Sequence, residues 1–172
     1  MRVYTMSEKK RLSSNAKIRK LISTPMSDTD IAPYLPAVLL REFDGKLPAI
    51  ILYEWEPYVG HWSMLLNTID DNGQSVIEFF DSYGYKPDEV LKVVNKKYNP
   101  NVVKWLLKNA NSVAYNSNKF QGAGGQIQTC GRRCVNRFLH RNWSAEEYFR
   151  RMKALKNKTG LSYDEIVCYL VP

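Results

Sequence analysis

Runs of apolar residues divide the first half of the chain into segments of strand length. Residues 49–53 form one such run, residues 61–66 form the next, and residues 76–81 follow the polar turn 70–73. Short continuous apolar runs that are bounded by turn residues are typical of buried strands. The pattern predicts three consecutive strands joined by hairpin turns, and residues 112–115 indicate one more strand.

From Cys130 onward the chain has the periodicity of a helix. At 100° per residue, apolar side chains gather on one half of the helical wheel and polar side chains on the other. The apolar half consists of Cys130, Cys134, Val135, Phe138 and Leu139, and the polar half of Arg132, Arg133, Asn136 and His140. The pattern predicts that Cys130 begins a helix whose apolar half packs into the core.

Capping residues predict where further helices begin. Ser144 and Ser162 each stand three residues before a glutamate, which is the pattern of a capping box. Residues 27–30 predict a short helix that stops near Pro33 or Pro36, and residues 87–91 and 99–107 predict two more. Strands in the first half and helices in the last third predict the α+β class.

Length and composition fit a single domain. The 172 residues, 44% of them hydrophobic, can bury a full core, and we expect a basic N-terminal arm at residues 1–20 followed by one domain at residues 21–172. The sequence has no run of eighteen apolar residues and no apolar stretch after its N-terminal charges, so we expect no membrane partner and no secretion. Three cysteines do not make a disulfide framework, which favours an intracellular protein.

The net charge of +8 is divided unevenly along the chain. Residues 1–20 hold seven Lys or Arg against one Glu, residues 28–89 hold three against twelve Asp or Glu, and residues 92–172 hold fifteen against four. A basic surface attracts nucleic acid through counterion release, but basic side chains also form solvated surfaces without a ligand. Charge alone leaves both interpretations open.

Only one of the two histidines can serve a cysteine nucleophile, which needs an imidazole within hydrogen-bond reach. His140 lies ten residues beyond Cys130 on the same predicted helix, about 15 Å along its axis, and it points away from Cys134. His61 is therefore the candidate base. Cys130 is the candidate nucleophile because the first turn of a helix stabilises a thiolate.

The loop before Cys130 predicts an oxyanion site. The backbone N–H of Cys130 is free at the start of its helix, and a glutamine amide from the loop can add a second donor. The candidate glutamines are Gln121, Gln126 and Gln128.

Asp81 is the candidate for the carboxylate that orients His61. It ends the strand expected to pair with the strand of His61, so it can hold the imidazole N–H. Glu78 is the rival, but strand alternation places it on the opposite face from Asp81.

Each of these residues also has an ordinary structural explanation. A buried cysteine is usually a small apolar core residue, and a histidine or an aspartate at a strand end is common. A zinc site is a further alternative, with Cys130, Cys134, His140 and Cys168 as ligands. Two cysteines four residues apart on one helix, with a misdirected histidine, make poor ligand geometry, so we predict no metal.

Four short motifs stand in a distinctive order along the chain. They are Gly60-His61-Trp62, Phe79-Phe80-Asp81-Ser82-Tyr83-Gly84, Phe120-Gln121-Gly122 and Thr129-Cys130-Gly131. Together they resemble the adenovirus maturation protease and the related ubiquitin-like-protein-specific proteases, and among these the maturation proteases of virophages and other capsid-building DNA elements. The resemblance covers about residues 45–142. It implies a papain-like-related cysteine protease core, in which a mostly antiparallel mixed sheet packs on a central helix that carries the nucleophile.

The resemblance also implies a role for each matched residue. These roles are base for His61, acidic member for Asp81, nucleophile for Cys130, oxyanion donor for Gln121 and lining of the substrate groove for Trp62. Gln121 stands nine residues before Cys130, whereas the glutamine of the family usually stands six or seven before its cysteine. Either the loop bulges or Gln126 takes the role.

The function implied is that of a cysteine endopeptidase that processes capsid or core precursor proteins of a virus or virophage. Those precursors would be its partners, in the infected host cell and in the virion. The chemistry requires no cofactor, and the resemblance implies DNA as an activator that binds through a basic surface. Two alternatives stay open: a protease that removes ubiquitin-like modifiers, and a basic nucleic-acid-binding, capsid-associated module without catalysis.

Overall fold

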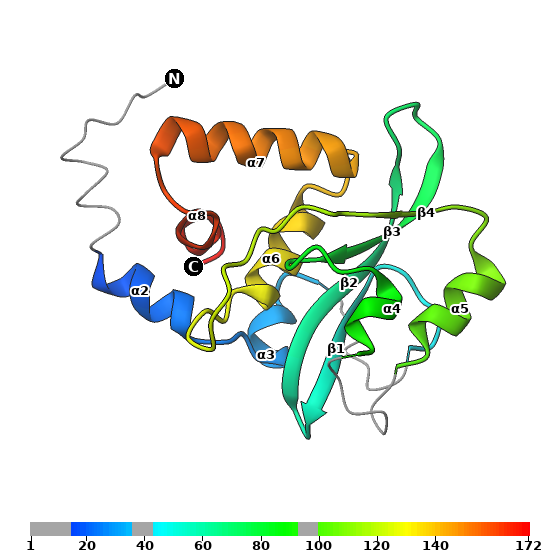
Figure 1. Cartoon of the computed structure of the whole chain (residues 1–172), viewed down its shortest axis with the longest axis horizontal. Helices are drawn as coiled ribbons and strands as arrows, with labels where there is room; N and C mark the ends of the chain where they lie inside the picture. Colours follow the sequence, from blue (N-terminus) through cyan, green and yellow to red (C-terminus); the bar gives the residue numbers. More distant parts are fainter. Residues whose placement is uncertain (1–14, 36–42, 93–99) are drawn as a thin grey trace.

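A four-stranded mixed sheet lies at the centre of the computed structural model, which describes residues 15–35, 43–92 and 100–172 (Figure 1). In their order across the sheet, the strands are β1 (Ala49–Glu56), β2 (Val59–Ile69), β3 (Ser75–Asp81) and β4 (Val113–Tyr115). The first three pair antiparallel, and β4 joins β3 in parallel. The predicted hairpin-connected strands and the additional strand are confirmed.

Helices flank this sheet, and the α+β class is confirmed. They are α2 (Ala16–Ser23), α3 (Asp28–Ile31), α4 (Pro87–Val90), α5 (Val102–Asn109), α6 (Cys130–Leu139), α7 (Ala145–Thr159) and α8 (Tyr163–Leu170). Ser27 and Ser162 head complete capping boxes, and Ser144 accepts the N–H of Glu147 at the start of α7. The helix starts predicted at these serines and at Cys130 therefore agree with the structure. The helix predicted over residues 99–107 begins later, at Val102, and residue 99 lies outside the described residues.

The two faces of the sheet bury different helices. One face packs on α6 and consists of Ile50, Trp62, Met64, Leu66 and Phe80, which meet Cys134 and Val135. The other face packs on α4 and α5 and consists of Ala49, Ile51, Tyr53, Leu65 and Phe79, which meet Val90, Val102 and Leu106. Because successive strand residues point to opposite faces, the continuous apolar runs in the sequence supply both layers.

Nearly every side of α6 is buried, which corrects the expected division into a core half and a polar half. Arg133 and Asn136 of the polar half are fully buried, whereas Leu139 of the apolar half is 47% exposed. The hydroxyl of Tyr148 on α7 donates to Asn136 Oδ1 at 2.7 Å, and Arg133 lies 3.5 Å from Asp164 on α8. Since α7 and α8 cover this side of α6, the pattern of a surface helix does not apply to it.

The arm expected at residues 1–20 overlaps a packed helix. Residues 16–20 belong to α2, whose Ile18 is buried with Val167 and Cys168 of α8. Residues 1–14 lie outside the described residues. The domain therefore includes residues 16–20, which the charge pattern assigns to the arm.

A buried ion pair joins β3 to the end of α6. Arg137 Nε and Nη2 donate to the two carboxylate oxygens of Glu78 at 2.9 and 2.6 Å, and both side chains are fully buried. Arg137 also donates to the carbonyl oxygens of His140 and Trp143 beyond the helix end. Glu78 therefore faces α6, away from Asp81, as strand alternation predicts.

Removing one partner of this ion pair should destabilise the fold strongly. We expect Arg137→Ala to lower the free energy of unfolding by about 3–5 kcal/mol, because Glu78 would keep a buried charge without a partner. Urea denaturation measures the change. The matched control is the double variant Arg137→Met with Glu78→Leu, which should recover most of the loss. A loss below about 1 kcal/mol for Arg137→Ala would contradict the expectation.

Candidate active site

The register of β2 and β3 brings His61 and Asp81 together. Ser63 is paired with Asp81 across the ladder, and His61 lies two residues earlier on the same face of β2. His61 Nε2 lies 2.7 Å from Asp81 Oδ2, and both side chains are buried. The contact predicted from the spacing of the two residues is confirmed.

The carboxylate of Asp81 is held from several sides. Ser63 Oγ donates to Oδ2 at 2.7 Å, and the N–H of Tyr83 donates to Oδ1 at 2.8 Å. The side chain of Asn116 clamps the Asp81 backbone, accepting its N–H at 2.9 Å and donating to its carbonyl oxygen at 2.7 Å. Burial raises the pKa of Asp81, but the charge and hydrogen bonds of its partners, His61 first, lower it below its ordinary value. Asp81 is therefore a fixed, ionised acceptor.

Cys130 completes this arrangement as the first residue of α6. Its side chain is 3% exposed, and His61 lies close enough to lower the pKa of its thiol. Because Nε2 of His61 is engaged with Asp81, Nδ1 is the ring nitrogen left for the thiol. Burial raises the pKa of the Cys130 thiol, but the hydrogen bonding and charge of His61, with the backbone N–H groups of Trp62 and Gly131, lower it below its ordinary value.

The pKa of His61 moves in the opposite direction. Burial lowers the pKa of the imidazole, but the negative charges of Asp81 and Cys130 and their hydrogen bonds outweigh burial and raise it to about 10. A raised imidazole pKa beside a lowered thiol pKa favours the imidazolium–thiolate form of the pair over the neutral form. The thiolate is the nucleophilic form of cysteine.

The other cysteines and the other histidine have ordinary environments. Burial raises the pKa of Cys134 well above its usual value and the pKa of Cys168 to about 11. His140 caps the far end of α6, where its Nδ1 lies 2.8 Å from the carbonyl oxygen of Asn136. Within the described ranges, no group of three or more His, Cys, Asp or Glu side chains is arranged to hold a metal ion.

The candidate glutamines lie in different environments. Gln121 is buried and contacts the loop after β3 through Ser82 and Tyr83. Gln126 is exposed, and Gln128 Nε2 donates to the carbonyl oxygen of Gly125 within its own loop. The structure therefore brings Gln121, rather than Gln126, to the loop that follows Asp81.

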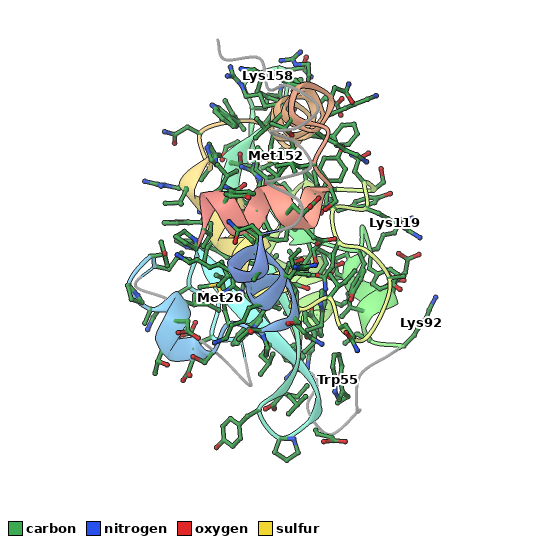
Figure 2. The ribbon with its side chains drawn as sticks, turned by 90° about the vertical axis from the view of Figure 1, so that its left-hand side faces the viewer. Met26, Trp55, Lys92, Lys119, Met152 and Lys158 are labelled. Atoms are coloured by element: carbon green, nitrogen blue, oxygen red, sulfur yellow. The ribbon has the colours of Figure 1, made fainter. Side chains whose placement is uncertain are left out.

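Trp62 lies under the start of α6. It is 7% exposed, and its indole N–H donates to the carbonyl oxygen of Met26 at 3.0 Å; Met26 is labelled in Figure 2. A Cβ atom on Gly131 would lie 3.0 Å from Met26 Cβ and 3.2 Å from Trp62 Cδ1, so glycine lets α6 approach this closely. The role of Trp62 in a substrate groove stays a prediction.

Asp164 on α8 supports the candidate site, and the sequence did not predict this. Its Oδ2 accepts the N–H of Gly122 at 3.0 Å, and its Oδ1 accepts the hydroxyl of Thr129 at 2.6 Å. One carboxylate thus ties the glycine-rich loop at residues 122–125 to Thr129, the residue before Cys130. Asp164, like Asn116, is far from its partners in sequence and carries no local signal. Ser63 does carry one, because it shares a strand face with His61.

Basic side chains gather on α7. Arg150, Arg151, Lys153 and Lys156 are exposed on this helix, although the two arginines also pair with Glu147. Figure 2 places Lys158, near the end of α7, at the opposite end of the molecule from Trp55 on the β1–β2 hairpin. DNA as a partner of this surface stays a prediction. In the described part of the chain, none of the helices has the length and apolar character to cross a membrane.

Comparison with known proteins places the chain in a viral family. No family model matches it. Over 125 residues it is 33% identical to the uncharacterized protein V9 of the Sputnik virophage, and the match covers 69% of each chain. The chain belongs to the V9 family. Its relative is a virophage protein, which supports a viral origin for this chain too.

Proposed function

We propose that this member of the V9 family is a cysteine endopeptidase that processes capsid or core precursor proteins. The observation that carries the proposal is the buried contact of His61 with Asp81, at 2.7 Å, beside Cys130 at the start of α6, where the pKa of the thiol is lowered by His61. The resemblance of the four motifs to maturation proteases supports the substrate class, and the virophage relative supports a viral origin. Action in the infected cell and in the virion is part of the proposal.

The proposed reaction begins when the Cys130 thiolate attacks the scissile carbonyl carbon. A C–S bond forms, and the carbonyl electron pair moves to the oxygen, which accepts the backbone N–H of Cys130. The C–N bond then breaks, and His61 gives its Nδ1 proton to the leaving amine. Neutral His61 next takes a proton from water, which attacks the thioester; the acid leaves and the thiolate–imidazolium pair is restored.

The placement of the three groups supports the papain-like-related fold that we propose for the core. The nucleophile begins a buried helix, while the base and the acid stand on two neighbouring strands of the sheet. Asp81 fixes the orientation of the imidazole and stabilises its charged form. This is the arrangement that acyl transfer through a thiolate requires.

Selective alkylation tests whether Cys130 is an activated nucleophile. We expect a limiting amount of iodoacetamide at pH 7 to modify Cys130 first, at a rate that depends less on pH near neutrality than that of an ordinary thiol, because His61 lowers the pKa of Cys130. In His61→Ala the rate at pH 7 should fall by about thirtyfold or more, since a thiol of ordinary pKa is only a few per cent ionised there. The alkylation rate of His61→Ala should rise with pH, because more of the thiol becomes ionised. Intact-mass spectrometry followed by peptide mapping gives the rate and the site.

His140→Ala is the matched control for this experiment. It removes the second imidazole of the chain, from the far end of α6, and should leave the rate at Cys130 unchanged. Labelling that is slow, spread over Cys130 and Cys168, and insensitive to His61→Ala would contradict the proposal. It would favour a basic binding module in its place.

A further inference from the structure

The side-chain amide of Gln121 is fully engaged within the protein. Its Oε1 accepts the hydroxyl of Ser82 at 2.7 Å. Its Nε2 donates to the hydroxyl oxygen of Tyr83 at 3.0 Å and to the carbonyl oxygen of Ile127 at 2.8 Å. An amide nitrogen carries two hydrogens, and both are used by these contacts. Gln121 therefore has no free N–H to offer to a substrate oxyanion.

Tyr83 stands between Gln121 and the catalytic pair. Its ring lies against the imidazole of His61, with ring centroids 4.9 Å apart and an angle of 32° between the planes. Its backbone N–H is fixed by Asp81. Tyr83 is thus held in place at both its backbone and its hydroxyl, beside the base that serves Cys130.

The hydroxyl of Tyr83 keeps a hydrogen to donate. A phenol both accepts and donates, and Tyr83 accepts from Gln121, so its own hydrogen is available. Burial, with the negative charges of Cys130 and Asp81, raises the pKa of Tyr83 to about 12, so the group stays protonated over the working range of a protease. The side chain is partly exposed, which leaves it open to a substrate.

We propose that the Tyr83 hydroxyl is the second donor to the oxyanion, beside the Cys130 backbone N–H. In this arrangement Gln121 is a positioning residue. It holds the Tyr83 hydroxyl and polarises it through the series Ser82 to Gln121 to Tyr83, because linked hydrogen bonds strengthen one another. The inference rests on the proposed function and changes one part of it, namely which side chain touches the reacting oxygen. No covalent bond to Tyr83 forms.

Two reactions of Cys130 separate this role from general support of the site. Acylation by 4-nitrophenyl acetate places a negative charge on the ester carbonyl oxygen and is followed by release of 4-nitrophenolate. Alkylation by iodoacetamide breaks a C–I bond and places no charge on a carbonyl oxygen. We expect Tyr83→Phe to slow acylation on the order of 10²-fold, as loss of one oxyanion donor does in other enzymes, and to leave the alkylation rate within twofold of wild type.

Tyr85→Phe is the matched control, because it removes a hydroxyl from the neighbouring tyrosine, whose ring lies 5.7 Å from that of Tyr83. Its acylation rate should equal that of wild type. Gln121→Met supplies the second test. It should slow acylation in the wild-type background but add less than about threefold to Tyr83→Phe, since coupled residues are not additive.

The outcomes are distinct. If Tyr83→Phe acylates as fast as wild type, or faster, the inference is overturned while the proposed nucleophile stands. If the effects of Gln121→Met and Tyr83→Phe on the acylation rate multiply fully in the double variant, the inference is also overturned. Gln121 would then be a direct donor to the oxyanion. If wild type shows neither acylation nor selective alkylation at Cys130, the proposed function itself fails.

Discussion

Cys130→Ala is expected to abolish peptide-bond cleavage, with a fall in kcat of about 10⁶-fold, the loss that follows removal of a catalytic nucleophile in well-studied hydrolases. The reason is that Cys130 alone combines a lowered thiol pKa with an imidazole partner. The measurement is cleavage of the structural proteins encoded by the same genome, incubated with the purified protein and mapped by mass spectrometry. The fold should persist, because a single buried sulfur atom is lost.

Cys134→Ala is the matched control for the nucleophile. Cys134 lies one turn further along α6, and burial raises its pKa, so its removal should leave cleavage within about twofold of wild type. Cleavage by Cys130→Ala at a rate near that of wild type would refute the assignment. Cleavage of a fusion to a ubiquitin-like modifier, with the structural proteins left intact, would assign the same chemistry to the alternative substrate.

The parts of the site that follow from local patterns were predictable from the sequence. The runs around His61 and Asp81 have strand periodicity, and a spacing of twenty residues suits two strands joined by a turn. The helical period after Cys130 and the glycine-rich loop before it mark a helix start. The same reasoning excluded His140, which caps the far end of α6, and placed Glu78 on the opposite face from Asp81.

Other features depend on contacts between distant segments and could not be predicted. The burial of the polar half of α6 follows from the packing of α7 and α8 over it, and a helical wheel does not show which elements cover a helix. Asp164 reaches the loop at Gly122 from more than forty residues away. The hydrogen bonds of Gln121 likewise depend on how the loop folds back onto Tyr83, which residue spacing does not reveal.

Asp81→Asn is expected to lower cleavage by about 10⁴-fold, as loss of the orienting carboxylate does in the serine protease triad. The change keeps the size of the side chain but removes its negative charge. That charge helps to raise the pKa of His61, so the pKa of the imidazole should fall in the variant. The imidazolium is then lost at a lower pH than in wild type, where it persists to about pH 10. In a profile of cleavage rate against pH, the loss of activity on the alkaline side should therefore move toward neutral pH. This side of the profile is its alkaline limb.

Glu78→Gln is the matched control, because it makes the same chemical change on the same strand but on the face toward α6. It should weaken the fold through its buried partner Arg137, yet leave the alkaline limb where it is and the turnover of each folded molecule near that of wild type. Comparing the two pH profiles separates a carboxylate that sets the charge of His61 from one that only supports the core. An Asp81→Asn variant with turnover within tenfold of wild type and an unmoved alkaline limb would show that His61 works without it.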